Sequence, residues 1–287
     1  MRAFVRELDD AAARKAALDA VRSDAAKDNT SRRCIPATMQ ASGRIVAKSD
    51  FTLCGVAEAD AIFKSRGVRV NWRKHEGEFA KKGDDVCTVE GNARAILACE
   101  RTVLNYLSLL SGIATKCRAA SQKYGKWKIS ATRKTLPNLT HSQKRAVAIG
   151  GCLTHRLTLA DGILVKDNHL AAIMEGEGAA REEAIAIAVG RFPRGAFVEV
   201  EVSSVNEALA AMRAGAKAIL IDNLPEAKFA KVAKAARGEN GRVVIEASGG
   251  IALANAGKYL EAGADFVSTS ELTMKVAPAN LSLEFDF

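Results

Sequence analysis

The sequence predicts an α/β protein built on a parallel sheet that is either open or closed into a barrel. From about residue 126 onward, short runs rich in Val and Ile alternate with alanine-rich stretches of helical character. Successive runs lie roughly 20–35 residues apart, the length that a strand, a crossover helix and the next strand require. Six such runs therefore predict six parallel strands with helices packed against them.

The first third of the chain has a mixed pattern of helices and strands. One helix is expected to end at Gly67, because glycine accepts the left-handed conformation that follows many helices. A long helix is expected because apolar residues between Ile96 and Leu110 recur with a 3.6-residue period. The elements predicted in this part are helices over 4–22, 56–67 and 92–123 and strands over 43–54, 68–74 and 86–91.

The rest of the chain alternates between the two element types. Each strand is identified by its Val and Ile content, and each helix by its alanine content. The predicted strands are 126–132, 161–166, 196–202, 217–222, 242–247 and 264–268. The later strands are separated by predicted helices over 180–190, 204–214, 225–237 and 252–262.

Composition restricts the class of protein. The chain has 287 residues, of which 48% are hydrophobic and 26% charged, as in a globular protein with a sizeable core. The formal net charge of +9 favours anionic partners, whether phosphates, carboxylates, nucleic acids or lipid headgroups. Aromatic residues make up only 5%, which disfavours nucleic-acid binding through a basic stripe with interleaved aromatic rings.

The cysteine pattern and the N-terminal residues predict a cytoplasmic protein. The six cysteines are irregularly spaced and form no CxxC pair, as expected for reduced, mostly buried thiols. The segment MRAFVRELDDAAARK lacks the apolar centre of a signal peptide, and no run of about 18 apolar residues predicts a membrane span. The four histidines show no metal-binding spacing such as HExxH.

Ionisable residues and glycines gather at the carboxyl ends of the predicted strands. This edge is where a barrel of parallel strands carries its chemistry. By strand alternation, Glu199 and Glu201 face the same side of their strand. The other residues at these ends, or in the GGCLTHR segment between the first two strands, are Arg133, Lys134, His155, Arg156, Lys166, Asp222, Ser248, Gly249, Gly250 and residues 268–271.

Together these residues suit a phosphosugar and a carboxylated second substrate. Arginine binds carboxylates in a fork, and the backbone N–H groups of a Ser-Gly-Gly loop entering a helix bind phosphate. Carboxylates hold Mg²⁺ or accept hydrogen bonds from sugar hydroxyls. Each feature alone has an ordinary explanation, since Lys166 could be a solvated lysine and Asp222 could cap a turn. Their coincidence at five strand ends favours a binding site.

Seven segments occur in an order that resembles one enzyme family. They are ERTVLNYLSLLSGIAT, TRKTLPN, GGCLTHR, ILVKDNH, VEVEV, ILIDN and EASGGI. From roughly residue 25 to its end, the chain resembles the quinolinate phosphoribosyltransferases, also called nicotinate-nucleotide pyrophosphorylases (carboxylating). The first segment and the Lys-Asp-Asn-His block are long and specific.

The resemblance implies a fold, a reaction and an assembly. The fold is an N-terminal α/β sandwich domain over 1–112, joined by the C-terminal tail 276–287, and an incomplete, seven-stranded α/β barrel over 113–275. The reaction converts quinolinate and phosphoribosyl pyrophosphate, with Mg²⁺, to nicotinate mononucleotide, pyrophosphate and CO₂ in de novo NAD biosynthesis. The assembly is a homodimer or higher homo-oligomer with shared active sites. Neither nucleic acid nor a membrane is an expected partner.

The resemblance also implies roles for residues of this chain. The expected quinolinate-binding set is Thr132, Arg133, Lys134, His155, Arg156 and Lys166, with Arg101 reaching in from another subunit. Glu201 and Asp222 would hold the ribose hydroxyls and are the candidate protein ligands of Mg²⁺, which otherwise binds mainly through the substrate. The expected phosphate-binding set is Ser248, Gly249, Gly250, Thr269, Ser270 and Glu271. The expected catalytic residues are Lys134, Lys166, Glu201 and Asp222.

Several positions differ from the usual pattern of that family. Ala131 stands where an Asp usually precedes Thr-Arg-Lys, and Cys152 and Thr154 replace a Gly and an Asn. Glu271 adds a carboxylate and Met274 replaces a histidine within the segment that begins at Ser270, while RSDAAKDNT replaces a glycine-rich acidic segment. These changes affect the expected phosphate and Mg²⁺ contacts and leave the expected quinolinate cations intact.

Three alternatives remain at this point. A related family associated with molybdate transport shares the expected fold but lacks the Lys-Asp-Asn-His block. A Schiff-base aldolase would use Lys166 as its nucleophile, which requires an apolar pocket or a second cation, whereas Asp167 acts the other way. An inactive relative retained for assembly is the third alternative, suggested by the departures.

Overall fold

The computed structural model describes residue 8 and residues 10–286, which form two compact units. The N-terminal unit comprises the described residues up to 122, together with 134–152 and 272–286. The barrel unit comprises 123–133 and 153–271. The boundary expected between residues 112 and 113 falls inside helix α4 (Ala93–Tyr124), most of which belongs to the N-terminal unit. The start of the helix expected over 4–22 lies outside the described residues.

The barrel unit is built on six parallel strands, as the sequence predicts. They are β6 (Ile129–Ala131), β7 (Ile163–Val165), β8 (Val198–Val202), β9 (Ala218–Asp222), β10 (Val244–Ser248) and β11 (Phe266–Thr269). Their order across the sheet is β6-β11-β10-β9-β8-β7. A parallel bridge between Ser130 and Leu153 adds a seventh position beside β6. Among the described residues no pairing joins that position to β7, so the barrel is incomplete.

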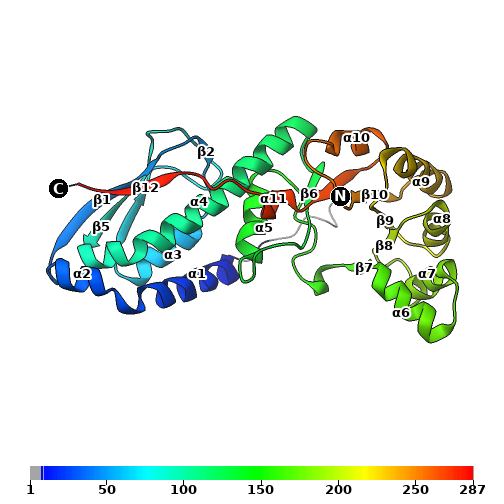
Figure 1. Ribbon diagram of the computed structural model, residues 1–287, viewed down its shortest axis with the longest axis horizontal. Helices are drawn as coiled ribbons and strands as arrows, with labels where there is room; N and C mark the ends of the chain where they lie inside the picture. The colour runs from blue at the N-terminus through cyan, green and yellow to red at the C-terminus, as the bar shows by residue number, and fades with distance from the viewer. Residues whose placement is uncertain (1–7, 9, 287) are drawn as a thin grey trace. The chain divides into compact units, whose positions relative to one another are not determined.

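Helices follow the strands of the barrel unit and lie outside the sheet (Figure 1). They are α6 (Asp167–Glu177), α7 (Arg181–Gly190), α8 (Val205–Arg213), α9 (Glu226–Glu239) and α10 (Ala256–Glu261), with short η3 (Leu159–Asp161) before β7. Helix α11 (Glu271–Met274) begins at the last residue of the barrel unit and continues in the N-terminal unit. Local sequence sets their starts. The Ser204 side chain, for example, accepts the Glu207 N–H and so satisfies a free donor in the first turn of α8.

Strand alternation puts a polar layer above an apolar one inside the barrel. Every second residue of a strand faces the same side of the sheet. On β9, β10 and β11 the inward face begins with an apolar residue. Leu153, Ala218 and Phe266 form a buried cluster there. Further along the same faces stand Asp222, four residues after Ala218, and Glu246. The floor of the barrel is therefore apolar, and carboxylates occupy its carboxyl-end half.

The N-terminal unit combines an antiparallel sheet with helices. Its sheet has the order β12-β1-β5-β3, formed by β1 (Gln40–Ala47), β3 (Arg69–Trp72), β5 (Asp85–Asn92) and β12 (Leu281–Asp286), and a second pair joins β2 (Phe51–Thr52) and β4 (Phe79–Ala80). Besides α4, its helices are α1 (Asp10–Asp24), η2 (Ala25–Lys27), α2 (Asn29–Cys34), α3 (Val56–Ser65) and α5 (Thr140–Ile149). Among the residues described, each helix is too short or too polar to cross a bilayer.

The last strand of the chain pairs with the first strand of the sheet. β12 lies antiparallel to β1, with Leu281 opposite Ala47 and Phe285 opposite Gly43 (Figure 1). Gly43 permits this close pairing, because a Cβ there would lie 2.7 Å from the Glu284 carbonyl oxygen. The C-terminal residues therefore complete the N-terminal unit.

A buried ion network ties three helices of this unit together. Arg145 of α5 is 8% exposed and forms ion pairs with Glu58 of α3 and, at 3.2 Å, with Asp10 of α1. It also lies 3.5 Å from Glu76, whose carboxylate accepts the N–H of Val56 at the start of α3. Burial raises the pKa of Glu58, and Arg145 opposes that shift. Carboxylates therefore match both terminal nitrogens of Arg145, whereas its Nε has no hydrogen-bond partner among the described residues.

Candidate active site

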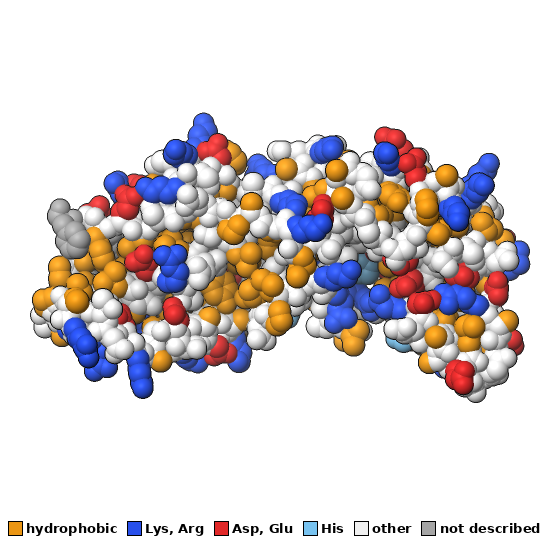
Figure 2. Space-filling view, in the orientation of Figure 1, with side chains coloured by type: hydrophobic (Ala, Val, Ile, Leu, Met, Phe, Trp, Pro, Cys, Tyr) orange, Lys and Arg blue, Asp and Glu red, His pale blue; other side chains and the backbone are white. Residues whose placement is uncertain are grey.

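The carboxyl ends of the barrel strands bring most of the predicted site residues to one edge. Glu201 and Asp222 stand at the ends of neighbouring strands β8 and β9, and Ser248 pairs in register with Asp222. Figure 2 shows acidic and basic side chains side by side over this part of the barrel unit. Arg133 follows β6 at the other side of the sheet, where its side chain is exposed.

Lys166 and Glu201 form an ion pair at this edge. Lys166 follows β7, Glu201 lies on the adjacent strand, and Nζ lies 3.3 Å from Oε2. The Lys166 side chain is 51% exposed, whereas that of Glu201 is 16% exposed. The backbone N–H of Lys166 donates to Nδ1 of His169, so this histidine shapes the turn into α6. The amine is thus paired with a carboxylate, whereas an aldolase nucleophile needs an apolar pocket or a second cation.

The ends of β9 and β10 approach each other closely. Asn223 has a left-handed backbone, with φ of 52°, and its N–H donates to the Ser248 carbonyl at 3.1 Å. Its side-chain amide donates to the Asp222 carboxylate. Gly249 has a φ of 86°, and a Cβ there would lie 2.4 Å from the Asn223 nitrogen. Glycine is therefore required at 249 on grounds of space and of backbone conformation.

Two predicted phosphate-site residues brace the loop that follows the glycines. The buried Thr269 hydroxyl donates to the Ile251 carbonyl at 2.7 Å. Glu271 Oε2 accepts the Leu253 N–H at 2.8 Å. The Glu271 carboxylate, which the family pattern lacks, thus already accepts a hydrogen bond from the backbone. It holds the loop around Ser248–Leu253, with its two left-handed glycines, in place.

Arg156 is buried with part of its hydrogen-bonding capacity unused. The residue is 8% exposed, and its Nε has no hydrogen-bond partner among the described residues. Nη1 makes only a 3.5 Å contact to the Gly162 carbonyl. Burial is the largest cause that lowers the pKa of Arg156, and the charge of Arg133 is the next. Two neighbouring cations with an unsatisfied buried donor form a place that favours an anion.

His155, the residue before Arg156, points into the barrel interior. Its Nε2 lies 2.9 Å from Oε2 of Glu246 and 3.4 Å from Oε2 of Glu199. Its Nδ1 accepts the backbone N–H of Arg156 at 2.8 Å. The histidine is 7% exposed and the two glutamates are 2% exposed. Both ring nitrogens are therefore engaged by the protein, whereas a ligand role was expected for this side chain.

The three buried groups share their protons. Burial opposes charge on the His155 ring, but Glu246 and Glu199 outweigh it and raise the pKa of His155 to about 9. Burial and Glu246 raise the pKa of Glu199 to about 7, while His155 overcomes burial to lower the pKa of Glu246. These pKa values place the shared proton on the His155 ring. The acceptor role of Nδ1 instead requires a neutral ring and places that proton on Glu199. In both arrangements the cluster carries a single net negative charge.

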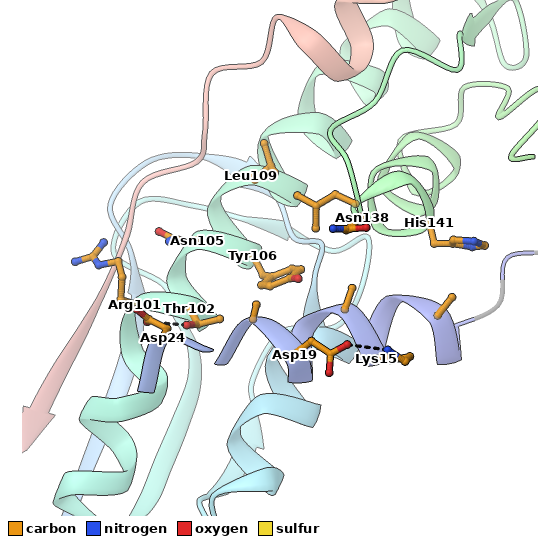
Figure 3. A pocket seen from close by; sticks show the side chains of 14 residues that line it. Lys15, Asp19, Asp24, Arg101, Thr102, Asn105, Tyr106, Leu109, Asn138 and His141 are labelled. Carbon is orange, nitrogen blue, oxygen red and sulfur yellow. Dashed lines mark hydrogen bonds and ion pairs between the residues drawn. The ribbon is translucent and has the colours of Figure 1, made fainter. Parts of the chain in front are cut away.

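Two predicted site residues belong to the N-terminal unit. Lys134 has an exposed side chain, and its carbonyl accepts the Thr273 hydroxyl at 2.6 Å. Arg101 is exposed on α4, at one end of a pocket of about 840 Å³ that α1, α4 and residues 138–141 line (Figure 3). No described residue forms an ion pair with Arg101. Asp24 accepts the Thr102 hydroxyl at 3.0 Å across the same pocket.

The other departures from the family pattern lie at buried or peripheral positions. Ala131 is fully buried at the end of β6, and Thr154 is 2% exposed. Cys152 is buried and its Sγ contacts the Cys117 carbonyl at 3.4 Å, whereas Met274 is 49% exposed. The six cysteines are all free, and Cys34 alone among them is exposed, as expected for reduced thiols.

Sequence reasoning missed one residue of the site, Glu246. It stands inside the run VVIEAS, and only the residues after it were considered as a site. The signal was nonetheless present, because a carboxylate two residues before Ser248 faces the same side of the strand. A charged side chain in a buried strand requires a partner.

Comparison with known proteins places the chain among enzymes of one kind. The family model described as "Quinolinate phosphoribosyl transferase, N-terminal domain" matches residues 28–111, and that of the C-terminal domain matches 113–284. The chain is 34% identical over 264 residues to a probable nicotinate-nucleotide pyrophosphorylase [carboxylating] of Methanothermobacter thermautotrophicus, covering 90% of this chain and 93% of that one. It is 36% identical to the Mycobacterium leprae enzyme of that name, covering 90% of each.

Solved structures agree with this match. The crystal structure of NadC from Streptococcus pyogenes superposes with a TM-score of 0.84 at 31% identity, covering 98% of this chain and all of that one. The nicotinate-nucleotide pyrophosphorylase of Francisella tularensis has the same TM-score at 25% identity, covering 98% and 99%. These matches favour the main sequence prediction over the molybdate-associated and aldolase alternatives. Matched by both domain models, the chain belongs to the quinolinate phosphoribosyltransferase family.

Proposed function

We propose that this chain transfers the phosphoribosyl group of phosphoribosyl pyrophosphate to quinolinate, with release of pyrophosphate and CO₂, to give nicotinate mononucleotide. The observation that carries the proposal is the buried Arg156 guanidinium, which has an unpaired Nε and lies close enough to Arg133 for their charges to interact. A carboxylated substrate would match these cations. The carboxylates needed by a phosphosugar stand on strands of the same sheet.

The residues of the barrel unit divide the work between the two substrates. Arg133 and Arg156 would fix the quinolinate carboxylates and so aim the ring nitrogen at C1′ of the sugar, because positioning supplies much of the rate of such a displacement. Glu201 and Asp222 would accept hydrogen bonds from the ribose hydroxyls. The N–H groups of the loop at Gly249 and Gly250 would bind the 5′-phosphate. Lys166, held by Glu201, would stabilise negative charge as it develops.

Decarboxylation follows from the same arrangement. Once the ring nitrogen is bonded to C1′, the ring is cationic and can accept the electrons that the departing CO₂ leaves at the adjacent carbon, which then takes up a proton from water. Fixed cations near that carbon stabilise the developing charge without having to reorganise. We propose Lys134, Lys166, Glu201 and Asp222, the set that the family resemblance implies, as the catalytic residues. No covalent intermediate with the protein is needed.

We propose Mg²⁺ as the metal of the reaction. Mg²⁺ prefers oxygen ligands and is held by one or two carboxylates together with substrate phosphates. Glu201 and Asp222 fit this requirement, since both are carboxylates at neighbouring strand ends and both are partly exposed. When bound, the ion would neutralise charge on the departing pyrophosphate.

We also propose a homodimer or higher homo-oligomer with shared sites, in the cytoplasm. Arg101 supports the shared site, because it is an exposed cation without an ion-pair partner among the described residues, and a twofold dimer would present two such arginines symmetrically. The free cysteines support a reducing compartment.

The decisive experiment follows the carboxyl carbon. Quinolinate labelled in the carboxylate next to the ring nitrogen is incubated with the protein, with and without phosphoribosyl pyrophosphate. Release of labelled CO₂ that requires both substrates and Mg²⁺ is the expected result. Absence of release from folded protein, or release without phosphoribosyl pyrophosphate, would contradict the proposal.

A further inference from the structure

The cluster of His155, Glu199 and Glu246 is unusual for the interior of a barrel. Three ionisable side chains are buried there, and burying charge is costly unless the groups serve one another. The apolar floor of the barrel adjoins the cluster, and the ring of Phe266 meets His155 edge-on at 6.3 Å between centroids. An apolar set of similar volume would pack at lower cost, so the cluster calls for an explanation other than packing.

The backbone of His155 supplies the first part of that explanation. Its φ of 53° lies in the left-handed region, which is uncommon for residues other than glycine and persists only where the surroundings determine it. Two hydrogen bonds determine it here. Nδ1 accepts the N–H of Arg156 at 2.8 Å, and Nε2 is held 2.9 Å from Oε2 of Glu246.

The second part lies with the next residue. Arg156 follows directly from this backbone turn, and among the described residues its buried Nε has no hydrogen-bond partner. The long contact to the Gly162 carbonyl is the one hydrogen bond that the guanidinium makes within the part of the chain that the structure describes. The direction of the side chain is therefore set largely by the turn at His155, which the ring and the glutamates hold.

We propose that Glu246 is a positioning residue that acts through His155 to aim Arg156 at a substrate carboxylate. The contacts run from the Glu246 carboxylate to Nε2, through the ring to Nδ1, and from there to the Arg156 N–H. Glu199 is the weaker support, at 3.4 Å and with its Oε1 unpaired. The inference rests on the proposed function, because it takes the ligand of Arg156 to be the quinolinate carboxylate.

The test measures the effect on each substrate separately and compares the contributions of Glu246 and His155. KM for quinolinate and KM for phosphoribosyl pyrophosphate are measured for the wild type and for Glu246→Ala, Glu246→Gln, His155→Ala and the Glu246→Ala/His155→Ala double variant. Glu207→Ala is the matched control, since Glu207 is a carboxylate of the same unit that is 6% exposed and accepts the Ser203 N–H at 2.8 Å. Thermal unfolding confirms that each variant is folded, and Glu246→Gln keeps an acceptor for the ring if the alanine variant does not fold.

Glu246→Ala is expected to raise the quinolinate KM tenfold or more, with the phosphoribosyl pyrophosphate KM changed less than twofold. Glu246→Gln should recover part of this loss, and the control should match the wild type. The double variant should be no worse than His155→Ala, because a residue that acts through another adds nothing once the other is gone.

Two results would overturn the inference alone. One is an active enzyme whose quinolinate KM is unchanged by Glu246→Ala, or is raised together with that of phosphoribosyl pyrophosphate. The other is an additive double variant. A wild type that releases no CO₂ from quinolinate would overturn the proposed function and the inference with it, and that result is seen before any variant is compared.

Discussion

The ammonium nitrogen of Lys166 lies 3.3 Å from Oε2 of Glu201, across the ends of two neighbouring strands. Each group is the charge partner of the other before substrate arrives, and both face the edge where the substrates are proposed to bind. The pair therefore links a residue proposed to stabilise developing negative charge with one proposed to hold the ribose.

Lys166→Ala should abolish turnover and leave the fold intact. Half of the lysine side chain is exposed, so the ion pair adds only about 0–1 kcal/mol to stability. A charge-assisted contact to the substrate is worth roughly 1.5–3 kcal/mol, and more if it strengthens in the transition state. Lys134→Ala should behave alike, since its carbonyl still accepts from Thr273. Steady-state assays of both variants are compared with those of Lys231→Ala, which removes an exposed lysine of α9. Near-normal activity of Lys166→Ala or Lys134→Ala would remove that lysine from the mechanism.

Arg101→Ala and Arg156→Ala should complement each other in a mixed dimer. If Arg101 serves the site of the neighbouring subunit, mixing the two inactive proteins creates one intact site in some dimers, restoring up to roughly a quarter to a half of the activity. Activity is measured after subunit exchange has been verified by mass. No recovery despite complete exchange would show that Arg101 acts within its own subunit or not at all.

The quinolinate subsite should require two adjacent carboxylates. Burial and the charge of Arg133 lower the pKa of Arg156, so a ligand whose single carboxylate pairs with Arg133 leaves a buried cation unpaired. We expect nicotinate to bind on the order of tenfold to several hundredfold more weakly than quinolinate. Phthalate, which keeps both carboxylates without a ring nitrogen, should bind and inhibit. Calorimetric titration of the three ligands decides the matter, and equal affinities would contradict the assignment of these cations.

If the shared proton of the cluster lies on His155 rather than on Glu199, stability should fall as the pH rises above neutral. The pKa of His155 is raised to about 9 in the folded chain, so the folded state binds more protons than the unfolded state from the ordinary histidine value upward. This contribution is fully present below about pH 6.5 and is lost as the pH passes about 9. Urea unfolding of the wild type and His155→Gln should differ by roughly 1–3 kcal/mol more at pH 6 than at pH 9.5. A difference that is constant or grows with pH would mean that the ring is neutral throughout.

Much of this architecture follows from local sequence patterns. The Val- and Ile-rich runs predict all six barrel strands, and the apolar period from Ile96 to Leu110 predicts α4, because burial on both faces or on one stripe leaves a clear pattern. Helices α5 and α6 escaped prediction: the first turn of α6 falls in the Lys-Asp-Asn-His block, and α5 lies between two motifs. β12 alternates Leu281, Leu283 and Phe285, yet its pairing with β1 joins the ends of the chain and no local pattern reports it.

The candidate site, too, could be predicted from the sequence only in part. Strand alternation is enough to bring Glu201, Asp222 and Ser248 to one edge. It does not reveal that His155 turns its ring into the barrel, because that depends on a left-handed backbone and on a glutamate from a distant strand. Likewise, the sequence alone suggests that Glu271 adds a negative charge near the expected phosphate site. The structure shows that its carboxylate accepts the Leu253 N–H.

The pairing of β12 with β1 also bears on how the protein is made. Lys48 and Glu284, which form an ion pair in this region, are 236 positions apart in the chain. β12 is synthesised after every other strand described, so one edge of β1 stays unpaired beside β5 until β12 has left the ribosome. Contacts of such long range are slow to form, and an open strand edge is prone to pairing with other chains. The barrel unit, whose described segments lie within 123–271, has no such delay, and we expect it to be the first part of the nascent chain to resist proteolysis.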